Sequence, residues 1–231
     1  MATNGLAVGG TNDRFSFQDW LEMAANNEVD DEAIYEYLSP PLPENLVNRW
    51  LARISKIENA QRPNNVKLKE WRGRISRAKG RAFERLIIAI LKTVRFFESW
   101  NNVGTTTNEI DVLVEIGMGC QISPVIREWG THFICECKLT RDSINATWVG
   151  KLNTVLETHN AKVGVLVAAK GPPKGKVWTQ IHILSVKQPP CVIVCISLDD
   201  LIECQGAGSF LRLVTRRYLE VKVGAANLIS G

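Results

Sequence analysis

Two segments in which every second side chain is apolar constrain the fold of this chain more than any other feature. In residues 109–116 the side chains between the apolar ones are mostly acidic, and the apolar set is Ile110, Val112, Val114 and Ile116. Residues 131–139 repeat the pattern with the apolar set Phe133, Cys135, Cys137 and Leu139. Successive side chains of a β-strand point to opposite faces, so both segments are predicted to be strands with one buried face and one polar face.

Three polar residues of these segments form a candidate site. The connection of about fourteen residues lets the two strands pair as neighbours, which brings Asp111, Glu136 and Lys138 to one surface. Glu136 and Lys138 are expected to lie roughly 7 Å apart along their strand. Crowded carboxylates repel each other unless a cation joins them, and Mg²⁺ prefers oxygen ligands of this kind. The opposing interpretation is an ion pair between Glu136 and Lys138 on a strand surface, which stabilises a protein little.

The rest of the pattern predicts an α/β core with both faces of its sheet covered. Further strands are expected over residues 95–102, 163–169 and 191–197. Helices are expected over residues 44–61, 66–91, 145–160, 176–186, 199–204 and 209–220. Two shorter helices are expected over 17–26 and from Asp30 or Asp31 to Leu38, and a bend is expected near Gly73 or Gly80.

Charge divides the chain into two parts. Residues 1–45 carry a net charge of −8 and the remainder carries +12, within a total of +4. An acidic N-terminal segment followed by a basic remainder is typical of a polyanion-binding domain with an added segment. Ordinary solvated surface also explains this distribution of charge. The proline-containing break at residues 62–65 marks the predicted boundary. Residues 1–65 are predicted to be an acidic N-terminal helical extension with disordered first residues, and residues 66–231 are predicted to be the main domain.

A basic stripe lies on the long helix predicted over residues 66–91. Between Lys67 and Arg85 there are eight basic residues and only two acidic ones, Glu70 and Glu84. Such a stripe is typical of a helix that contacts phosphates, and a solvated helix face is the alternative. The predicted nucleic-acid-binding residues are Lys67, Lys69, Arg72, Arg74, Arg77, Lys79 and Arg81.

The composition bounds the location of the chain and the state of its cysteines. No apolar run reaches the roughly 18 residues that a membrane span needs, and the first residues lack a signal sequence, so we expect a cytoplasmic protein. The six cysteines contain no Cys-x-x-Cys pair, and four of them lie in apolar strand-like runs. They are therefore predicted to be reduced core residues in preference to zinc ligands.

Residues 80–171 resemble the PD-(D/E)xK nuclease superfamily, and most of all its Mrr-like restriction endonucleases. The matching pieces are residues 80–84, 108–112, 134–138 and 159–171. The resemblance implies a restriction-endonuclease-like core with the order α-β-β-β-α-β. It also implies that Asp111, Glu136 and the backbone carbonyl of Cys137 bind Mg²⁺ (with Mn²⁺ as a substitute) and that Lys138 is the catalytic lysine. Ile110 stands where the motif has proline, which is harmless because that side chain is not a ligand.

Further residues are candidates for the same site. The resemblance makes Glu84 an acidic residue of the catalytic centre on the first core helix, and an i,i+3 pair with Arg81 is the structural alternative. The helix after Lys138 lacks the Gln-x-x-x-Tyr motif of some relatives, and Lys151, Asn153 or His159 are possible substitutes that the sequence cannot rank. His132 shares the candidate face, but a single histidine on a strand is more often structural.

The leading functional hypothesis is a metal-dependent endonuclease that hydrolyses phosphodiester bonds in double-stranded DNA. The resemblance alone implies a role in restriction or phage defence. A non-cleaving nucleic-acid-binding module on the same fold is the first alternative, and a module that recruits a partner through residues 1–62 is the second. A homodimer would serve cleavage of both strands, but the sequence decides neither the oligomeric state nor DNA against RNA.

Overall fold

A five-stranded mixed β-sheet forms the centre of the molecule. The computed structural model describes residues 18, 19, 22, 26, 31–105, 109–140, 142–171, 173–206 and 208–224. The strands lie in chain order across the sheet and are β1 (Phe97–Gly104), β2 (Glu109–Ile116), β3 (His132–Lys138), β4 (Val163–Ala168) and β5 (Val192–Ser197). The β1–β2 and β2–β3 pairs are antiparallel, whereas β3–β4 and β4–β5 are parallel.

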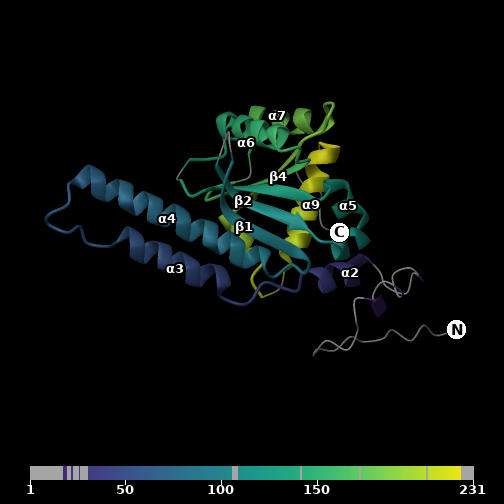
Figure 1. Cartoon of the computed structure of the whole chain (residues 1–231), viewed down its shortest axis with the longest axis horizontal. Coiled ribbons are helices and arrows are strands. Elements are labelled where there is room, and N and C mark those ends of the chain that lie inside the picture. The colour runs from purple at the N-terminus through teal and green to yellow at the C-terminus, as the bar shows by residue number, and fades with distance from the viewer. Residues whose placement is uncertain are drawn as a thin grey trace.

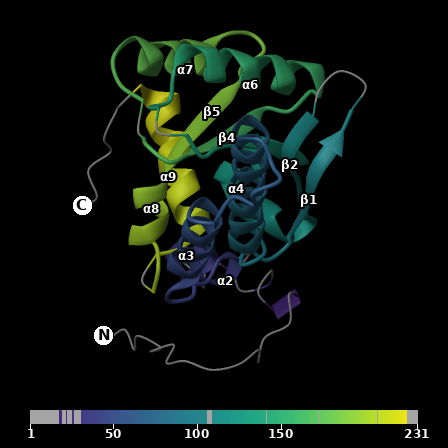
Figure 2. The ribbon, with the colours of Figure 1, turned by 90° about the vertical axis from the view of Figure 1, so that its left-hand side faces the viewer.

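Helices cover both faces of this sheet (Figures 1 and 2). The helices α6 (Ala146–Thr158) and α7 (Lys176–Val186) cover one face, whereas α4 (Leu68–Leu91) and α9 (Phe210–Val223) cover the other. The shorter helices are α2 (Asp31–Leu38), α3 (Leu46–Glu58), η1 (Met118–Ile122), α5 (Pro124–Trp129) and α8 (Leu198–Glu203). Within the described ranges, no helix is both long enough and apolar enough to span a membrane.

The predicted α/β class and the order of its main elements are confirmed. β2 has the predicted boundaries, and its burial alternates as the sequence indicates. The region between β2 and β3 was expected to be a connection only, but it contains η1 and α5, where Ser123 caps α5 and Pro124 occupies its first turn. The helix α4 passes through Gly73 and Gly80 without interruption, so the expected bend does not divide it. The predicted disorder over 1–14 lies outside the described residues, as does most of the helix expected over 17–26.

The N-terminal helices pack on the same core as the sheet. Ile34 and Leu38 of α2 and Val47 of α3 belong to one hydrophobic cluster with the strands and α4. Hydrogen bonds also connect this region to the C-terminal half, because Val47 N–H donates to the side-chain oxygen of Gln205 at 2.8 Å. The predicted boundary at residue 65 therefore falls between packed elements and stays a prediction.

The first half of α4 extends beyond the sheet. Its buried side chains all lie in the second half, from Ala82 to Leu91. In the first half, α4 lies beside α3, and the two helices extend away from the sheet (Figure 1). We call α3 together with residues 68–81 the helical arm. The basic stripe predicted from the sequence is therefore on a projecting structure.

Helix α6 lies close to β4 because Gly164 has no side chain. A Cβ atom at Gly164 would lie 2.9 Å from Cδ1 of Leu156 and 3.0 Å from Cδ2 of Leu152. Both leucines are buried in α6, so they have little room to move. Gly164 thus sets the position of α6 over the sheet, and α6 carries Lys151.

Two glycine substitutions should change stability in opposite directions. We expect Gly164→Ala to lower the free energy of unfolding by about 1–3 kcal/mol, because the new methyl group overpacks the α6–β4 contact. We expect Gly150→Ala to raise it by roughly 0.5–1 kcal/mol, because Gly150 lies within α6 and a Cβ there meets nothing within 4 Å. Urea denaturation followed by circular dichroism measures both effects. Equal effects of the two substitutions would contradict the packing described here.

Candidate active site

The pairing of β2 with β3 places two carboxylates beside each other. The recorded register pairs Val112 with Cys135 and Leu113 with Ile134. Extending this antiparallel register by one residue sets Asp111 opposite Glu136. Both residues lie near the end of the sheet where β2 begins and β3 ends.

Lys138 and the backbone of β3 connect these carboxylates. The backbone N–H of Cys137 donates a hydrogen bond of 2.8 Å to Oδ2 of Asp111. The ammonium of Lys138 forms an ion pair with Glu136 and lies 3.9 Å from Oδ2 of Asp111. The structure therefore brings Asp111, Glu136 and Lys138 together as the strand pattern predicts. At Cys137 the recorded contact with this cluster is the N–H group, not the carbonyl that the resemblance implies as a ligand.

Burial and charge shift the pKa values of this cluster. Burial raises the pKa of Glu136, and the negative charge of Asp111 raises it further, whereas Lys138 and Lys151 act in the opposite direction. Burial lowers the pKa of Lys138, but its hydrogen bond and ion pair with Glu136 outweigh that effect and leave the pKa raised. The lysine therefore stays protonated at neutral pH. It is the cation that offsets the repulsion between the two carboxylates.

Glu84 faces the same cluster from α4. Burial raises the pKa of Glu84, and so does the negative charge of Asp111, while a hydrogen bond with Asn102 acts against them. Its Oε2 atom is buried and has no hydrogen-bond partner. An unpaired buried carboxylate oxygen costs free energy, so this atom is suited to a ligand or an ordered water. Arg81 and Glu84, both described by the structure, form no ion pair, although the charge of Arg81 lowers the pKa of Glu84. The structural alternative is therefore left without a direct contact.

Two neighbours of this cluster were not assigned from the sequence. Asn102 of β1 approaches Glu84 from a backbone conformation with φ of 50°, which asparagine tolerates better than most residues. Lys151 was one of three unranked candidates, and its charge acts on Glu136. Asn153, the second of the three, donates a hydrogen bond to Glu157 and accepts one from Lys187, on a different side of α6.

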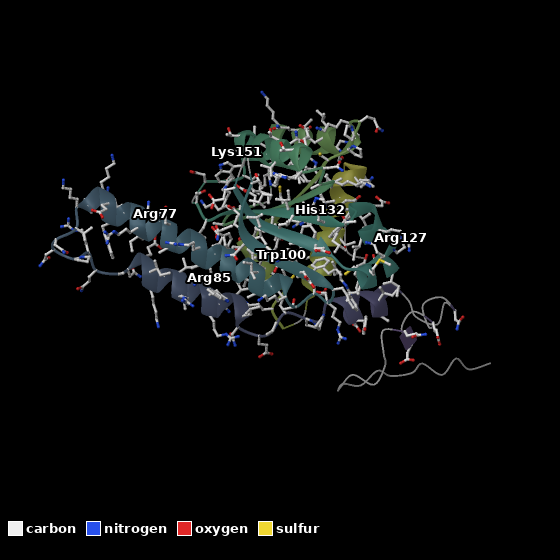
Figure 3. All side chains as sticks on the ribbon, viewed as in Figure 1. Arg77, Arg85, Trp100, Arg127, His132 and Lys151 are labelled. Atoms are coloured by element: carbon white, nitrogen blue, oxygen red, sulfur yellow. The ribbon has the colours of Figure 1, made fainter. Side chains whose placement is uncertain are left out.

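The two candidate histidines, His132 and His159, lie beside each other. His132 contacts the hydroxyl of Thr131 at 3.1 Å and the backbone carbonyl of His159 at 3.2 Å. Both histidines line a separate groove formed largely by residues of β1 and β2, beside Trp100. Figure 3 shows His132 and Trp100 over the sheet, away from the arm. The structural interpretation of His132 therefore fits its contacts.

The basic stripe divides into paired and unpaired residues. Arg74 pairs with Glu70 at 2.6 Å, and Lys79 pairs with Glu58 of α3 at 2.7 Å. Arg81 lines a small pocket between α3 and α4. In the described part of the chain, six stripe residues form no ion pair: Lys67, Lys69, Arg72, Arg77, Arg81 and Arg85.

The cysteines offer neither a thiolate nor a metal centre. All six are free, and four are buried. Burial raises the pKa of Cys120 and of Cys195 to about 12, so both stay protonated thiols at neutral pH. Within the ranges that the structure describes, no three residues of the His, Cys, Asp and Glu types lie close enough to hold a metal by themselves. Any metal at the Asp111–Glu136 cluster must therefore complete its coordination with backbone oxygen or water.

No protein-family model, curated protein or solved structure matches this chain. The resemblance to the PD-(D/E)xK superfamily therefore rests on the residues of the chain and stays a prediction.

Proposed function

We propose that this chain is a metal-dependent endonuclease that hydrolyses phosphodiester bonds in DNA. The observation that carries the proposal is the meeting of Asp111, Glu136 and Lys138 at one end of the sheet, with the ammonium between two carboxylates. Phosphodiester hydrolysis needs a means to stabilise negative charge on phosphate and a means to activate water. A carboxylate pair with an adjacent lysine supplies both.

The order of the secondary-structure elements also supports the proposal. From α4 onward, the main elements follow the order α4, β1, β2, β3, α6 and β4, which is the order that the resemblance implies. Asp111 lies on β2, and Glu136 and Lys138 lie on β3. These two strands are neighbours inside a mixed sheet that helices cover on both faces. We include the restriction-endonuclease-like fold in the proposal on these grounds.

The donor set fits a magnesium ion. Mg²⁺ is commonly held by one or two carboxylates and keeps several waters, so it does not need three side-chain ligands in contact. Asp111 and Glu136 are the residues that would hold it, with Cys137 offering a backbone carbonyl and Glu84 a buried oxygen without a partner. Among the described residues, the acids of the cluster outnumber its bases, because four acids (Glu84, Glu109, Asp111 and Glu136) interact with three cations (Arg81, Lys138 and Lys151). When bound, Mg²⁺ polarises the phosphate and lowers the pKa of a coordinated water.

The residues of the chain perform the remaining steps. Asp111 is oriented by the N–H of Cys137, so one of its oxygens is fixed relative to β3. Lys138 is kept protonated, and it donates to the attacking water or to the phosphate oxygen on which negative charge develops. Lys151 adds positive charge beside Glu136 and is suited to the phosphate backbone of the substrate.

The helical arm is suited to binding a polyanionic substrate. Lys67, Lys69, Arg72 and Arg77 present unpaired positive charge along a projecting helix, and the second half of the same helix carries Glu84 toward the candidate site. Positive side chains on such a surface bind phosphates and release counterions. A part in restriction or phage defence belongs to the proposal through the resemblance alone.

Plasmid cleavage tests the proposed activity. We expect the wild type to cut plasmid DNA in Mg²⁺ and to lose the activity in EDTA. Asp111→Ala and Lys138→Ala should each lower the rate at least a hundredfold, because each removes a charge from the reacting centre. Glu115→Ala is the matched control, since Glu115 is an exposed acid on the same strand and the same face.

Thermal melting must show that each variant is folded. Equal rates in the wild type, Asp111→Ala and Lys138→Ala would contradict the assignment of the site. A folded wild type that binds DNA but never cuts it would favour the non-cleaving module.

DNA binding at several salt concentrations tests the role of the arm. We expect Arg77→Ala to weaken binding to any DNA sequence and to reduce the slope of log K against log salt by about one, because one phosphate contact is lost. Arg127→Ala removes the same charge at the opposite end of the molecule and should leave the slope unchanged (Figure 3). If both variants changed the slope equally, the net charge of the protein, and not contact between the arm and DNA, would explain the salt dependence.

A further inference from the structure

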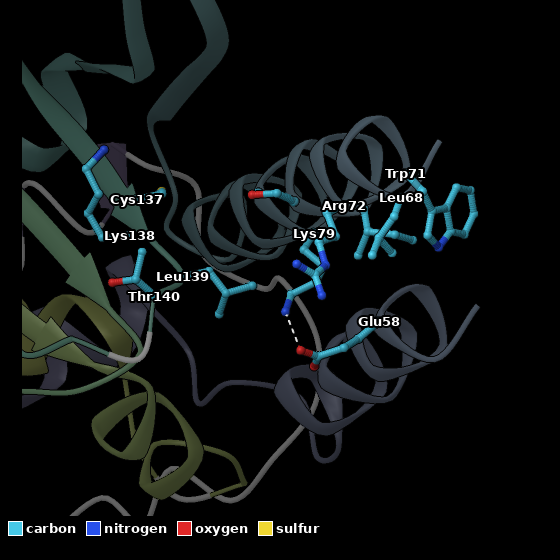
Figure 4. Close-up of a pocket in the computed structure, with 12 residues that line it drawn as sticks. Glu58, Leu68, Trp71, Arg72, Lys79, Cys137, Lys138, Leu139 and Thr140 are labelled. Carbon is cyan, nitrogen blue, oxygen red and sulfur yellow. Dashed lines mark hydrogen bonds and ion pairs between the residues drawn. The ribbon is translucent and has the colours of Figure 1, made fainter. Parts of the chain in front are cut away.

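A groove connects the helical arm with the end of strand β3. It encloses about 580 Å³ and is lined on one side by α4 and Glu58 of α3, and on the other by residues 137–140. Figure 4 shows Leu68 and Trp71 at one end of this groove and Cys137 and Lys138 at the other. The groove therefore leads from the arm to the backbone that holds the candidate site.

The arm side of the groove is apolar and incompletely covered. Leu68 is 49% exposed, and Trp71 and Ile75 are only partly buried, although all three are spaced to face one way along α4. None of them belongs to the hydrophobic core or to the residues packed against it. An accessible indole in a groove is a surface on which a flat ring stacks.

The charge of the groove is positive. Among the residues that the structure describes, the lining contains Arg72, Lys79 and Lys138 but a single acidic residue, Glu58, which pairs with Lys79. Arg72 forms no ion pair among the described residues and lies one position from Trp71. A ligand that matches this lining has a flat apolar part and a negative group beside it, which describes a nucleotide.

The size of the groove decides between paired and unpaired nucleotides. Its volume lies within the roughly 300–1,000 Å³ of sites that enclose small ligands. A duplex binds across an open surface of at least about 600–1,000 Å² and offers its bases only by their edges. Indole stacking needs an exposed base face, which unpaired strands provide.

We infer that this groove binds an unpaired stretch of a DNA strand, with a base stacked on Trp71 and its phosphate near Arg72. This inference rests on the proposed function, because it assigns the substrate class of that same site. The substrate is then DNA in which a duplex adjoins single strand, such as a tail, flap or gap. A free nucleotide shares the same chemistry, but the groove lies along the helix that also carries the unpaired basic side chains of Lys69 and Arg77, which suits a strand.

Binding to two labelled DNAs in EDTA tests the inference without any cleavage. One is a blunt duplex, and the other is the same duplex with a single-stranded tail, of either polarity, followed by fluorescence anisotropy. We expect the wild type to bind the tailed DNA more tightly. Trp71→Ala should weaken binding of the tailed DNA roughly tenfold and leave the blunt duplex unchanged, since one base–aromatic stack is lost.

Two variants control for folding and for the loss of any tryptophan. Trp71→Phe keeps an aromatic ring and should retain most of the preference for the tail. Trp100→Ala removes an exposed tryptophan on β1, outside the groove, and should leave the preference intact. An equal preference in the wild type and Trp71→Ala would overturn the inference, as would a wild type without a preference, or dAMP competing as strongly as the tail oligonucleotide.

The failure of this inference is separable from the failure of the proposed function. Cleavage that depends on Asp111, combined with no role for Trp71 in binding, would contradict only the inferred role of the groove. Binding of the tail that depends on Trp71, without any cleavage in Mg²⁺, would support the inferred role of the groove and contradict the proposed nuclease activity.

Discussion

The ion pair between Lys138 and Glu136, with Asp111 close by, is the interaction on which the candidate site depends. Two carboxylates at the end of neighbouring strands repel each other, and partial burial strengthens that repulsion. The ammonium of Lys138 offsets it, and the N–H of Cys137 holds the remaining carboxylate in place. A balance of this kind is easily shifted by a further cation. Since Glu84 also faces the cluster with an unpartnered oxygen, the site has unused capacity for positive charge.

Strand alternation made the centre of the site predictable. Because side chains on a strand alternate between faces, Asp111, Glu136 and Lys138 were assigned to one surface from the order of residues alone, and the register of β2 with β3 brings them together. The α/β class followed from the same pattern. Helix α5 was not predicted, because its six residues are too few to show a periodic pattern. Ser123 and Pro124 are nevertheless a typical start of a helix.

Other parts of the site required the three-dimensional structure. Asn102 reaches Glu84 only because β1 and α4 approach each other in space, and no local pattern indicates that contact. Lys151 could not be ranked above Asn153 or His159, since its position depends on how α6 lies over Gly164. The basic stripe was visible in the sequence, but which of its charges are already paired depends on contacts such as that of Lys79 with Glu58. The groove beside Trp71 has no sequence signature at all.

The most direct test of the proposed site is whether a metal ion binds at the carboxylate pair. Crystals of the wild-type protein soaked in MnCl₂ and measured near the manganese absorption edge locate the ion by its anomalous scattering. We predict one anomalous peak between Asp111 and Glu136 that is absent from crystals of Asp111→Ala. A map without a peak at these residues, with Lys138 still paired to Glu136, would contradict it.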